Sequence, residues 1–261
     1  MAIRLTATGL HHEVRGSGPA LLMIPGATGD GGHFARAAER LADEFTVITY
    51  DRRGNSRSHV SGDPAQVATM AAQADDAAAL VKECGFESAL VFGTSGGAVI
   101  TLELLARHPA VVRGAVLHEP PLISLLDLQG PSPLEPIFEL ARTDPRRAVE
   151  LFVRANSSDS AWDAIEPAAR ERMQGNGTTL FAHEIGNFLT YLPEEDRLKS
   201  AGKPVVLLHS REGLEFAPAI EGWLEGVFGV KGGVLTGHHA PYFDMPEVFA
   251  EELRPLLRSL A

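Results

Sequence analysis

The chain has 261 residues, of which 44% are hydrophobic and 22% charged, and its formal net charge is −11 at pH 7. Such an acidic chain without a basic block is a poor candidate for binding nucleic acid or an anionic membrane surface. The single cysteine, Cys84, excludes an internal disulfide and fits a reducing compartment.

The first segment, MAIRLTATGLHHEVRG (1–16), has no apolar stretch behind a basic start, so we predict no secretory signal. No apolar run reaches about 18 residues, the length that a membrane-spanning helix needs. We therefore expect a cytoplasmic protein that does not enter a membrane. The pairs His11/His12 and His238/His239 would point to opposite faces of a strand, so we expect no metal site from them.

Short apolar runs of β-type composition recur along the chain. Residues 3–9 and 10–16 predict an opening hairpin. The later runs are almost continuously apolar, which is typical of strands buried on both faces of a parallel sheet. These runs are ALLMIPG (20–26), FTVITYD (45–51), ALVFG (89–93), GAVLHE (114–119), PVVLLHS (204–210) and GGVLTG (232–237).

Helical patterns separate and follow these runs. Segment 66–85 is rich in alanine and ends in Gly85, a residue favoured just after a helix. Segment 96–109 ends in Arg-His-Pro, which stops a helix, and segment 246–260 closes the chain. The alternation predicts an α/β fold with a mostly parallel, doubly wound sheet.

Residues 121–203 interrupt this alternation, because they hold helical patterns and no convincing strand. The interval is too long for a simple crossover connection. We interpret it as a helical cap, or lid, inserted into a core made of residues 1–120 and 204–261. Most of its aromatic side chains should pack inside the cap. Trp162 and Phe188 are candidates for lining an apolar substrate pocket.

The segment GTSGG (93–97) is a G-x-S-x-G motif between a predicted strand and a predicted helix. A nucleophile elbow requires this context, since the flanking glycines permit a tight turn that presents Ser95 at the top of the sheet. The Gly96 N–H, at the start of the helix, could bind a developing oxyanion. The alternative is a serine that merely caps an ordinary strand–helix turn.

A serine nucleophile also needs a second oxyanion donor and a base. The loop PGATGDGGHF (25–34) follows an earlier strand and offers the Ala27 N–H, together with His33 as a pocket-lining candidate. This loop lacks the lysine of a phosphate-binding loop. The base is expected after the last strand, where His238 and His239 are available and one of them can face the serine.

Together these motifs resemble the α/β-hydrolase superfamily. In most members the third catalytic residue is an Asp after the strand that follows the cap. The corresponding segment here, LLHSREGLEFAP (207–218), has no Asp and offers Glu212 and Glu215. The segments that carry the resemblance are IPGATGDGGHF (24–34), YDRRGNSRS (50–58), GTSGG (93–97) and GHHAPYFDMPEVF (237–249).

Glu119, at the end of the strand before the cap, offers another acid, because the carboxyl ends of parallel strands meet at one edge of a sheet. The fungal zearalenone lactonases have a Glu as their acid in a similar His-Glu-x-Pro context, and this chain resembles them also in its oxyanion and histidine loops. That resemblance implies the order Ser95, Glu119, His239. Glu212 remains the alternative acid.

These residues predict a serine hydrolase that cleaves a carboxylic ester or lactone through an acyl-enzyme, without a metal or organic cofactor. The aromatic residues of the cap suggest a small-molecule substrate with a medium-sized apolar acyl group or a macrocycle, and a homodimer is compatible with the sequence. A cofactor-free lyase, acyltransferase or oxygenase on the same scaffold is an alternative. A ligand receptor that has kept the catalytic residues is another.

Overall fold

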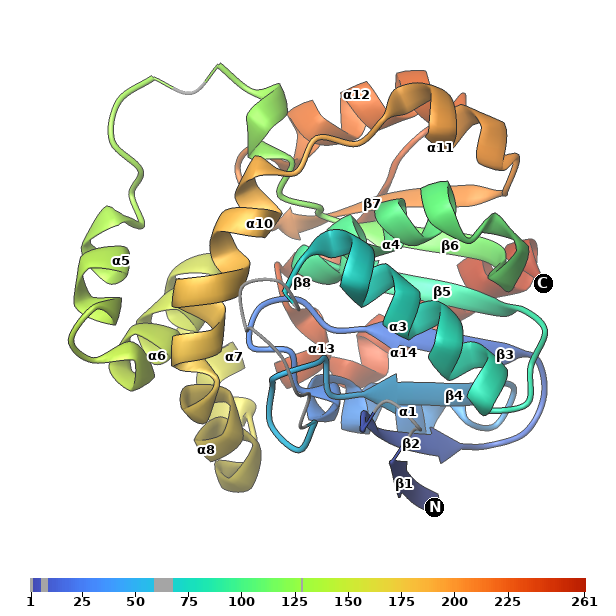
Figure 1. Cartoon of the computed structure of the whole chain (residues 1–261), viewed down its shortest axis with the longest axis horizontal. Helices are drawn as coiled ribbons and strands as arrows, with labels where there is room; N and C mark the ends of the chain where they lie inside the picture. The colour runs from blue at the N-terminus through green and yellow to red at the C-terminus, as the bar shows by residue number, and fades with distance from the viewer. Residues whose placement is uncertain (1, 6–8, 59–67, 128) are drawn as a thin grey trace.

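The computed structural model describes residues 2–5, 9–58, 68–127 and 129–261. Eight strands form one sheet in the order β1-β2-β4-β3-β5-β6-β7-β8. β1 and β2 pair antiparallel, as do β2 and β4, and the remaining pairs are parallel. The predicted α/β fold and its opening antiparallel pair are confirmed (Figure 1). The strands are β1 (Ala2–Leu5), β2 (His11–Arg15), β3 (Ala20–Ile24), β4 (Thr46–Tyr50), β5 (Ala89–Thr94), β6 (Val112–His118), β7 (Val205–Glu212) and β8 (Gly233–His238).

Helices cover both faces of this sheet. One face carries α3 (Met70–Glu83), α4 (Gly96–Arg107), α11 (Glu195–Ala201) and α12 (Ala217–Phe228), and the other carries α1 (Ala35–Leu41) and α14 (Pro246–Leu260). The helices predicted at 96–109 and 246–260 correspond to α4 and α14. The helix predicted at 66–85 corresponds to α3, which begins after Thr69, and its expected first residues, 66 and 67, lie outside the described residues.

Two apolar cores follow from the alternation of side chains along each strand. Leu22 and Ile24 of β3 pack into the core under α3 and α4, whereas Leu21 and Met23 pack into the core under α1 and α14. Both faces of the central strands are therefore buried. This double burial is the physical reason for the continuous apolar runs in the sequence.

Between β6 and β7 the described residues form helices and no strand. We keep the name cap for residues 121–203. Figure 1 shows α5, α6, α8 and α10 beyond the end of the sheet toward which β4 points, which is the edge that carries the predicted site. The elements of the cap include α5 (Glu135–Ala141), α6 (Pro145–Asn156), α7 (Asp159–Ala164), α8 (Pro167–Gly175), α9 (Gly177–Thr179), the π-helical turn η4 (Leu180–Glu184) and α10 (Ile185–Thr190).

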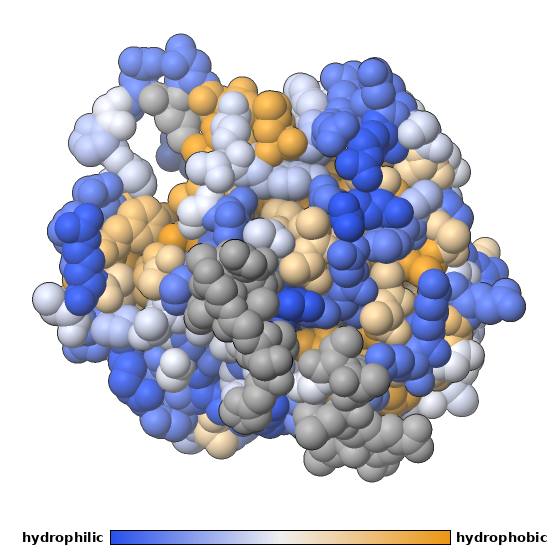
Figure 2. Space-filling view, in the orientation of Figure 1, coloured by the Kyte–Doolittle hydropathy of each residue, from blue (hydrophilic) through white to orange (hydrophobic). Residues whose placement is uncertain are grey.

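The surface is mixed in polarity. In Figure 2 hydrophilic residues are interspersed with smaller apolar areas on the face that carries α3 and α4. Leu192 and Val234 are large apolar side chains with high exposure, and isolated exposed residues of this kind are normal. Among the described residues, no helix has both the length and the apolar character needed to cross a membrane.

Candidate active site

Ser95 occupies the turn between β5 and α4, with φ 54° and ψ −127°. Residues other than glycine rarely adopt a positive φ, and such strained positions concentrate at functional sites. The Ser95 N–H donates to the carbonyl oxygen of His118 at 2.8 Å, and the Ser95 carbonyl accepts the Ala98 N–H at 2.9 Å. The turn is thus fixed both to the neighbouring strand and to its own helix.

The register of the sheet brings Ser95 and Glu119 to the same edge. Thr94 and His118 are the last residues of β5 and β6 and are paired with each other, so the residues that follow them are neighbours. Glu119 adopts a φ of 47°, and its N–H donates to the carbonyl oxygen of Leu208 in β7 at 3.1 Å. Two prolines then follow. The left-handed conformation at Glu119 turns the chain out of the sheet and into the cap.

Glu119 is 2% exposed, and its carboxylate contacts His239. His239 Nδ1 lies 2.5 Å from Glu119 Oε2, while the N–H groups of Ser210 and Leu214 donate to Oε1 and Oε2 at 2.9 and 3.4 Å. Burial raises the pKa of Glu119, but the hydrogen bond and charge of His239 and the Ser210 N–H lower that pKa to about 2. Glu119 is therefore ionised at neutral pH, accepts the Nδ1 proton and puts the basic lone pair of His239 on Nε2.

The other candidates for base and acid have different surroundings. His238 Nε2 lies 2.9 Å from Asp244 Oδ1, so this imidazole is engaged within its own loop. Glu212 is exposed at the end of β7. The structure therefore brings the candidate base His239 into contact with the candidate acid Glu119. The other candidates, His238 and Glu212, take no part in this contact.

The two predicted oxyanion donors are close to Ser95. Gly96 is the first residue of α4, where a backbone N–H has no acceptor within the helix. The loop after β3 passes against the serine, because a Cβ atom built on Gly26 would lie 2.8 Å from Ser95 Cβ and 3.4 Å from its Oγ. Only glycine fits at this position. Its peptide bond to Ala27 carries the second predicted donor.

The Ser95 hydroxyl forms no hydrogen bond with the described residues. Ser95 and His239 follow strands that end at the same edge of the sheet, and catalytic hydrogen bonds often form only when substrate is bound.

The cap places an aromatic ring directly on this site. A Cβ atom built on Gly96 would lie 2.8 Å from Cζ of Phe188, a buried residue of α10. Trp162 of α7 is also buried, but it belongs to the apolar cluster that the cap shares with α14 and the short helix α13 (Pro241–Asp244). Of the two cap aromatics that the sequence indicated, Phe188 is the one that lies against the nucleophile elbow.

His33 lies in the 3-10 helix η1 (Gly31–Phe34), at the end of the predicted oxyanion loop. Its Nε2 lies 3.1 Å from Thr28 Oγ1, and its ring packs edge-on against Phe243. Burial lowers the pKa of His33 to about 4, so the ring is neutral at neutral pH. His33 lines a pocket of about 260 Å³ together with Tyr242 and Phe243. Ser95 does not line this pocket.

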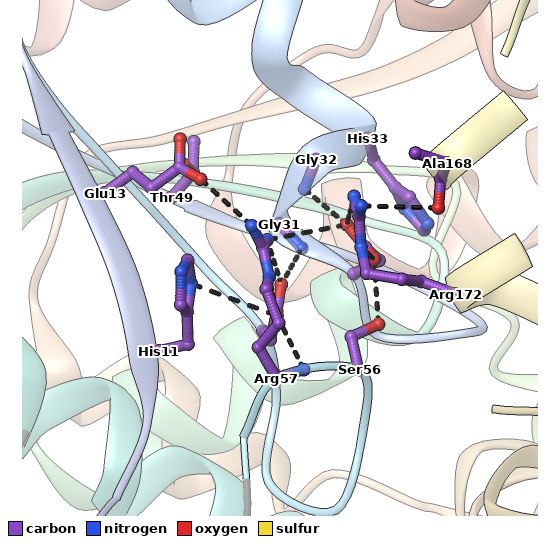
Figure 3. A network of polar contacts seen from close by, with 12 residues as sticks. His11, Glu13, Gly31, Gly32, His33, Thr49, Ser56, Arg57, Ala168 and Arg172 are labelled. Carbon is purple, nitrogen blue, oxygen red and sulfur yellow. Dashed lines mark hydrogen bonds and ion pairs between the residues drawn. The ribbon is translucent and has the colours of Figure 1, made fainter. Parts of the chain in front are cut away.

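Buried carboxylates accept hydrogen bonds from backbone N–H groups of the same loop. The N–H groups of Gly31 and Gly32 donate to Asp51 Oδ1 and Asp30 Oδ1 at 2.8 and 2.7 Å. Figure 3 shows that Arg57 and Arg172 approach this network from the loop after β4 and from the cap. These bonds hold residues 30–32 of the loop, which follow the Gly26–Ala27 peptide in the sequence and do not include it.

Two supports of the site were not identified from the sequence. Ser210 and Leu214 hold Glu119 through backbone N–H groups, and any residue except proline supplies such a group.

His118 is fully buried, and its ring stacks on that of His239 at 5.9 Å. Its Nδ1 and Nε2 lie 2.9 and 3.0 Å from the hydroxyls of Thr94 and Ser210. The sequence feature that could have identified His118 as part of the site is its position next to Glu119.

Comparison with known proteins gives the family of the chain. Residues 19–214 match the family model for the alpha/beta hydrolase fold. The uncharacterized hydrolase YraK of Bacillus subtilis (strain 168) is 31% identical, over 98% of this chain and 94% of that protein. A zearalenone hydrolase of Cladophialophora bantiana is 27% identical, over 95% of this chain and 92% of that protein.

Solved structures show the same fold. The N-acyl homoserine lactonase AidH complexed with N-butanoyl homoserine superposes with a TM-score of 0.77 at 23% identity, over 100% of this chain and 97% of that one. The family match spans most of the chain, and the full-length relatives are hydrolases. The chain therefore belongs to the α/β-hydrolase fold family and is a hydrolase.

Proposed function

We propose that the chain is a serine hydrolase that cleaves a carboxylic ester or lactone through Ser95, His239 and Glu119. The observation that carries this proposal is the 2.5 Å contact between His239 Nδ1 and Glu119 Oε2 at the sheet edge where Ser95 lies. A serine hydroxyl is a weak nucleophile unless a base accepts its proton, and a buried carboxylate–imidazole pair is such a base.

Acylation begins when Ser95 Oγ attacks the substrate carbonyl carbon and its proton passes to Nε2 of His239. The N–H groups of Gly96 and Ala27 bind the negative charge that develops on the carbonyl oxygen. The tetrahedral intermediate then collapses, the ester C–O bond breaks, and His239 gives its proton to the leaving alkoxide. Glu119 stays ionised throughout and stabilises the imidazolium.

Deacylation repeats these steps with water. His239 takes a proton from the water, the oxygen attacks the acyl carbon, and the second tetrahedral intermediate releases the carboxylic acid. The proton on His239 returns to Ser95 Oγ, which restores the enzyme. With a lactone, the alkoxide remains attached to the acyl group and the product is a hydroxy acid.

The proposed substrates are small-molecule esters and lactones with a medium-sized apolar acyl group or a macrocyclic ring. The names of the zearalenone hydrolase and of the N-acyl homoserine lactonase support lactones in particular. The cap, residues 121–203, would cover the bound acyl group, and Phe188 is the aromatic nearest to Gly96. His33 and Trp162 stay candidates for contact with the substrate.

A fluorophosphonate probe tests the nucleophile. Wild type should gain one phosphonyl group at Ser95, located by intact mass and peptide mapping, and Ser95→Ala should gain none. Both proteins are then assayed on a panel of esters, lactones and thioesters, where Ser95→Ala should lose at least about 10⁴-fold in turnover. Absence of labelling, or equal turnover by both proteins, would contradict the proposal. Products other than those of hydrolysis, which are an acid with an alcohol or thiol, or a hydroxy acid from a lactone, would favour an acyltransferase or lyase.

A further inference from the structure

Arg52 is a buried arginine that joins the loop after β3 to the cap. The side chain is 1% exposed. Its Nε donates to the carbonyl oxygen of Pro25 at 3.1 Å, and its Nη2 donates to that of Gly26 at 2.9 Å. Nη1 and Nη2 also lie 2.6 and 2.8 Å from the two carboxylate oxygens of Glu184. The guanidinium therefore bonds the oxyanion loop and the cap at the same time.

The carbonyl of Gly26 and the N–H of Ala27 belong to one peptide group. Since a peptide group is planar and trans, its C=O and N–H point in opposite directions. The Arg52 guanidinium and the Gly29 N–H, at 2.9 and 3.1 Å, hold this carbonyl oxygen and so fix the direction of the Ala27 N–H. A charged donor on the oxygen also polarises the peptide group and strengthens its N–H as a donor.

Arg52 also contacts the aromatic ring that lies against Gly96, the residue of the other proposed donor. The guanidinium carbon lies 5.3 Å from the centroid of the Phe188 ring, within the range of a cation–π interaction. The edge of that ring lies against Gly96. One side chain thus touches groups adjacent to both oxyanion donors.

Glu184 is the counter-ion that permits this arginine to be buried. The carboxylate is fully buried at the end of the π-helical turn η4, and it also accepts a hydrogen bond from Asn55 Nδ2 at 2.9 Å. Buried charges are retained in proteins when they are paired and hydrogen-bonded. Because Glu184 belongs to the cap, the ion pair of Arg52 depends on the position of the cap relative to the core.

We propose that Arg52 is a positioning residue that orients the Gly26–Ala27 peptide for oxyanion binding, and that Glu184 makes this orientation depend on the seating of the cap. The inference rests on the proposed serine hydrolase function. Arg52 acts through the Ala27 N–H, so its effect concerns the stabilisation of the oxyanion more than the binding of substrate.

A second cap-to-loop ion pair provides a matched control. Arg172 of α8 donates from Nε and Nη2 to the Asp30 carboxylate at 2.6 and 3.1 Å, in the same loop. Within the described part of the chain, its other acceptor is the Ala168 carbonyl oxygen of α8, as Figure 3 shows. Arg172 therefore ties the cap to a side chain of the loop, whereas Arg52 ties it to the peptide that carries the donor.

The test compares hydrolysis of a chromogenic ester with that of the matched thionoester, in which sulfur replaces the carbonyl oxygen. An oxyanion hole favours the oxygen substrate, so a misdirected donor lowers the ester-to-thionoester rate ratio. We expect Arg52→Met to lower kcat for the ester about 10- to 100-fold and to change KM little. The ester-to-thionoester rate ratio should fall as well. Arg52→Lys should recover part of both quantities. Arg172→Met should leave the ratio at the wild-type value.

Glu184→Gln should lower the ratio less than Arg52→Met, because the amide oxygen can still accept from Arg52. The double variant Arg52→Met/Glu184→Gln removes both charges, so it keeps the test valid if either unpaired charge prevents folding. Folding is followed by circular dichroism and thermal unfolding. A folded Arg52→Met or double variant with the wild-type ratio would overturn the inference, as would an equal loss of ratio in Arg172→Met.

Failure of the inference can be told apart from failure of the proposed function. Wild type that is labelled at Ser95 and hydrolyses the ester, together with variants of unchanged ratio, overturns the role of Arg52 alone. Wild type that is neither labelled nor active on any ester or lactone overturns the serine hydrolase and this inference with it.

Discussion

The ends of β6 and β7 are neighbours at the carboxyl edge of the sheet, and a glutamate stands at each end in a different environment. Glu119 is buried, has a positive φ and accepts hydrogen bonds from Ser210 in β7 and from Leu214 in the loop that follows β7. Glu212 is exposed at the end of β7 itself. β7 and the loop after it contribute backbone N–H groups to the neighbouring acid, whereas Glu212 faces solvent.

The backbone conformation of Glu119 is unfavourable in free energy. A left-handed conformation in a non-glycine residue costs about 1–2 kcal/mol. The carboxylate contacts with His239 and Ser210 offset this cost. Strain that is compensated by specific bonds to one side chain indicates a position selected for function.

The largest expected effect separates the two glutamates directly. Glu119→Gln preserves the shape of the side chain but removes the charge that stabilises the imidazolium. We expect turnover of an ester to fall about 1,000-fold or more, which corresponds to at least about 4 kcal/mol. Glu212→Gln is the matched control and should change turnover by less than about twofold, since its side chain is exposed. If the two variants behaved in the opposite way, Glu212 would be the acid.

A pH titration of stability sharpens the same comparison. The pKa of Glu119 falls from 4.5 to about 2 on folding. A carboxyl group with a lowered folded pKa stabilises the protein fully above about pH 4.5, and this contribution is lost as the pH falls toward 2. The free energy of unfolding of wild type, relative to Glu119→Gln, should therefore decrease by about 3 kcal/mol across that window. Urea unfolding at several pH values measures this difference, and a constant difference would contradict the assigned ion pair.

Most of the fold was predictable from the sequence for a simple reason. Strands buried on both faces need continuous apolar runs, and glycine or proline marks where they end, as at ALLMIPG before the oxyanion loop. The G-x-S-x-G context predicted where Ser95 lies, because it requires a strand before it and a helix after it.

The supports of the site were less predictable, because they depend on distance in space. Arg52 and Glu184 are separated by 132 residues. Each looks like an ordinary charged residue in its own segment. The sequence alone left Glu119 and Glu212 as alternatives for the catalytic acid. It shows which strands end in glutamate but not which carboxylate points into the protein.

The smallest effect tests whether the loop after β7 was shaped around Glu119. A Cβ atom at Gly213 would lie 1.8 Å from Glu119 Oε1, so Gly213→Ala should displace the carboxylate and lower turnover about 30-fold, or about 2 kcal/mol. Gly222→Ala in α12 is the control, because its Cβ would meet nothing within 4 Å and helix propensity favours alanine. In a Glu119→Gln background, Gly213→Ala should have little further effect, since both changes act through one contact. Additive losses in that double variant would mean that Gly213 serves the loop backbone and not the acid.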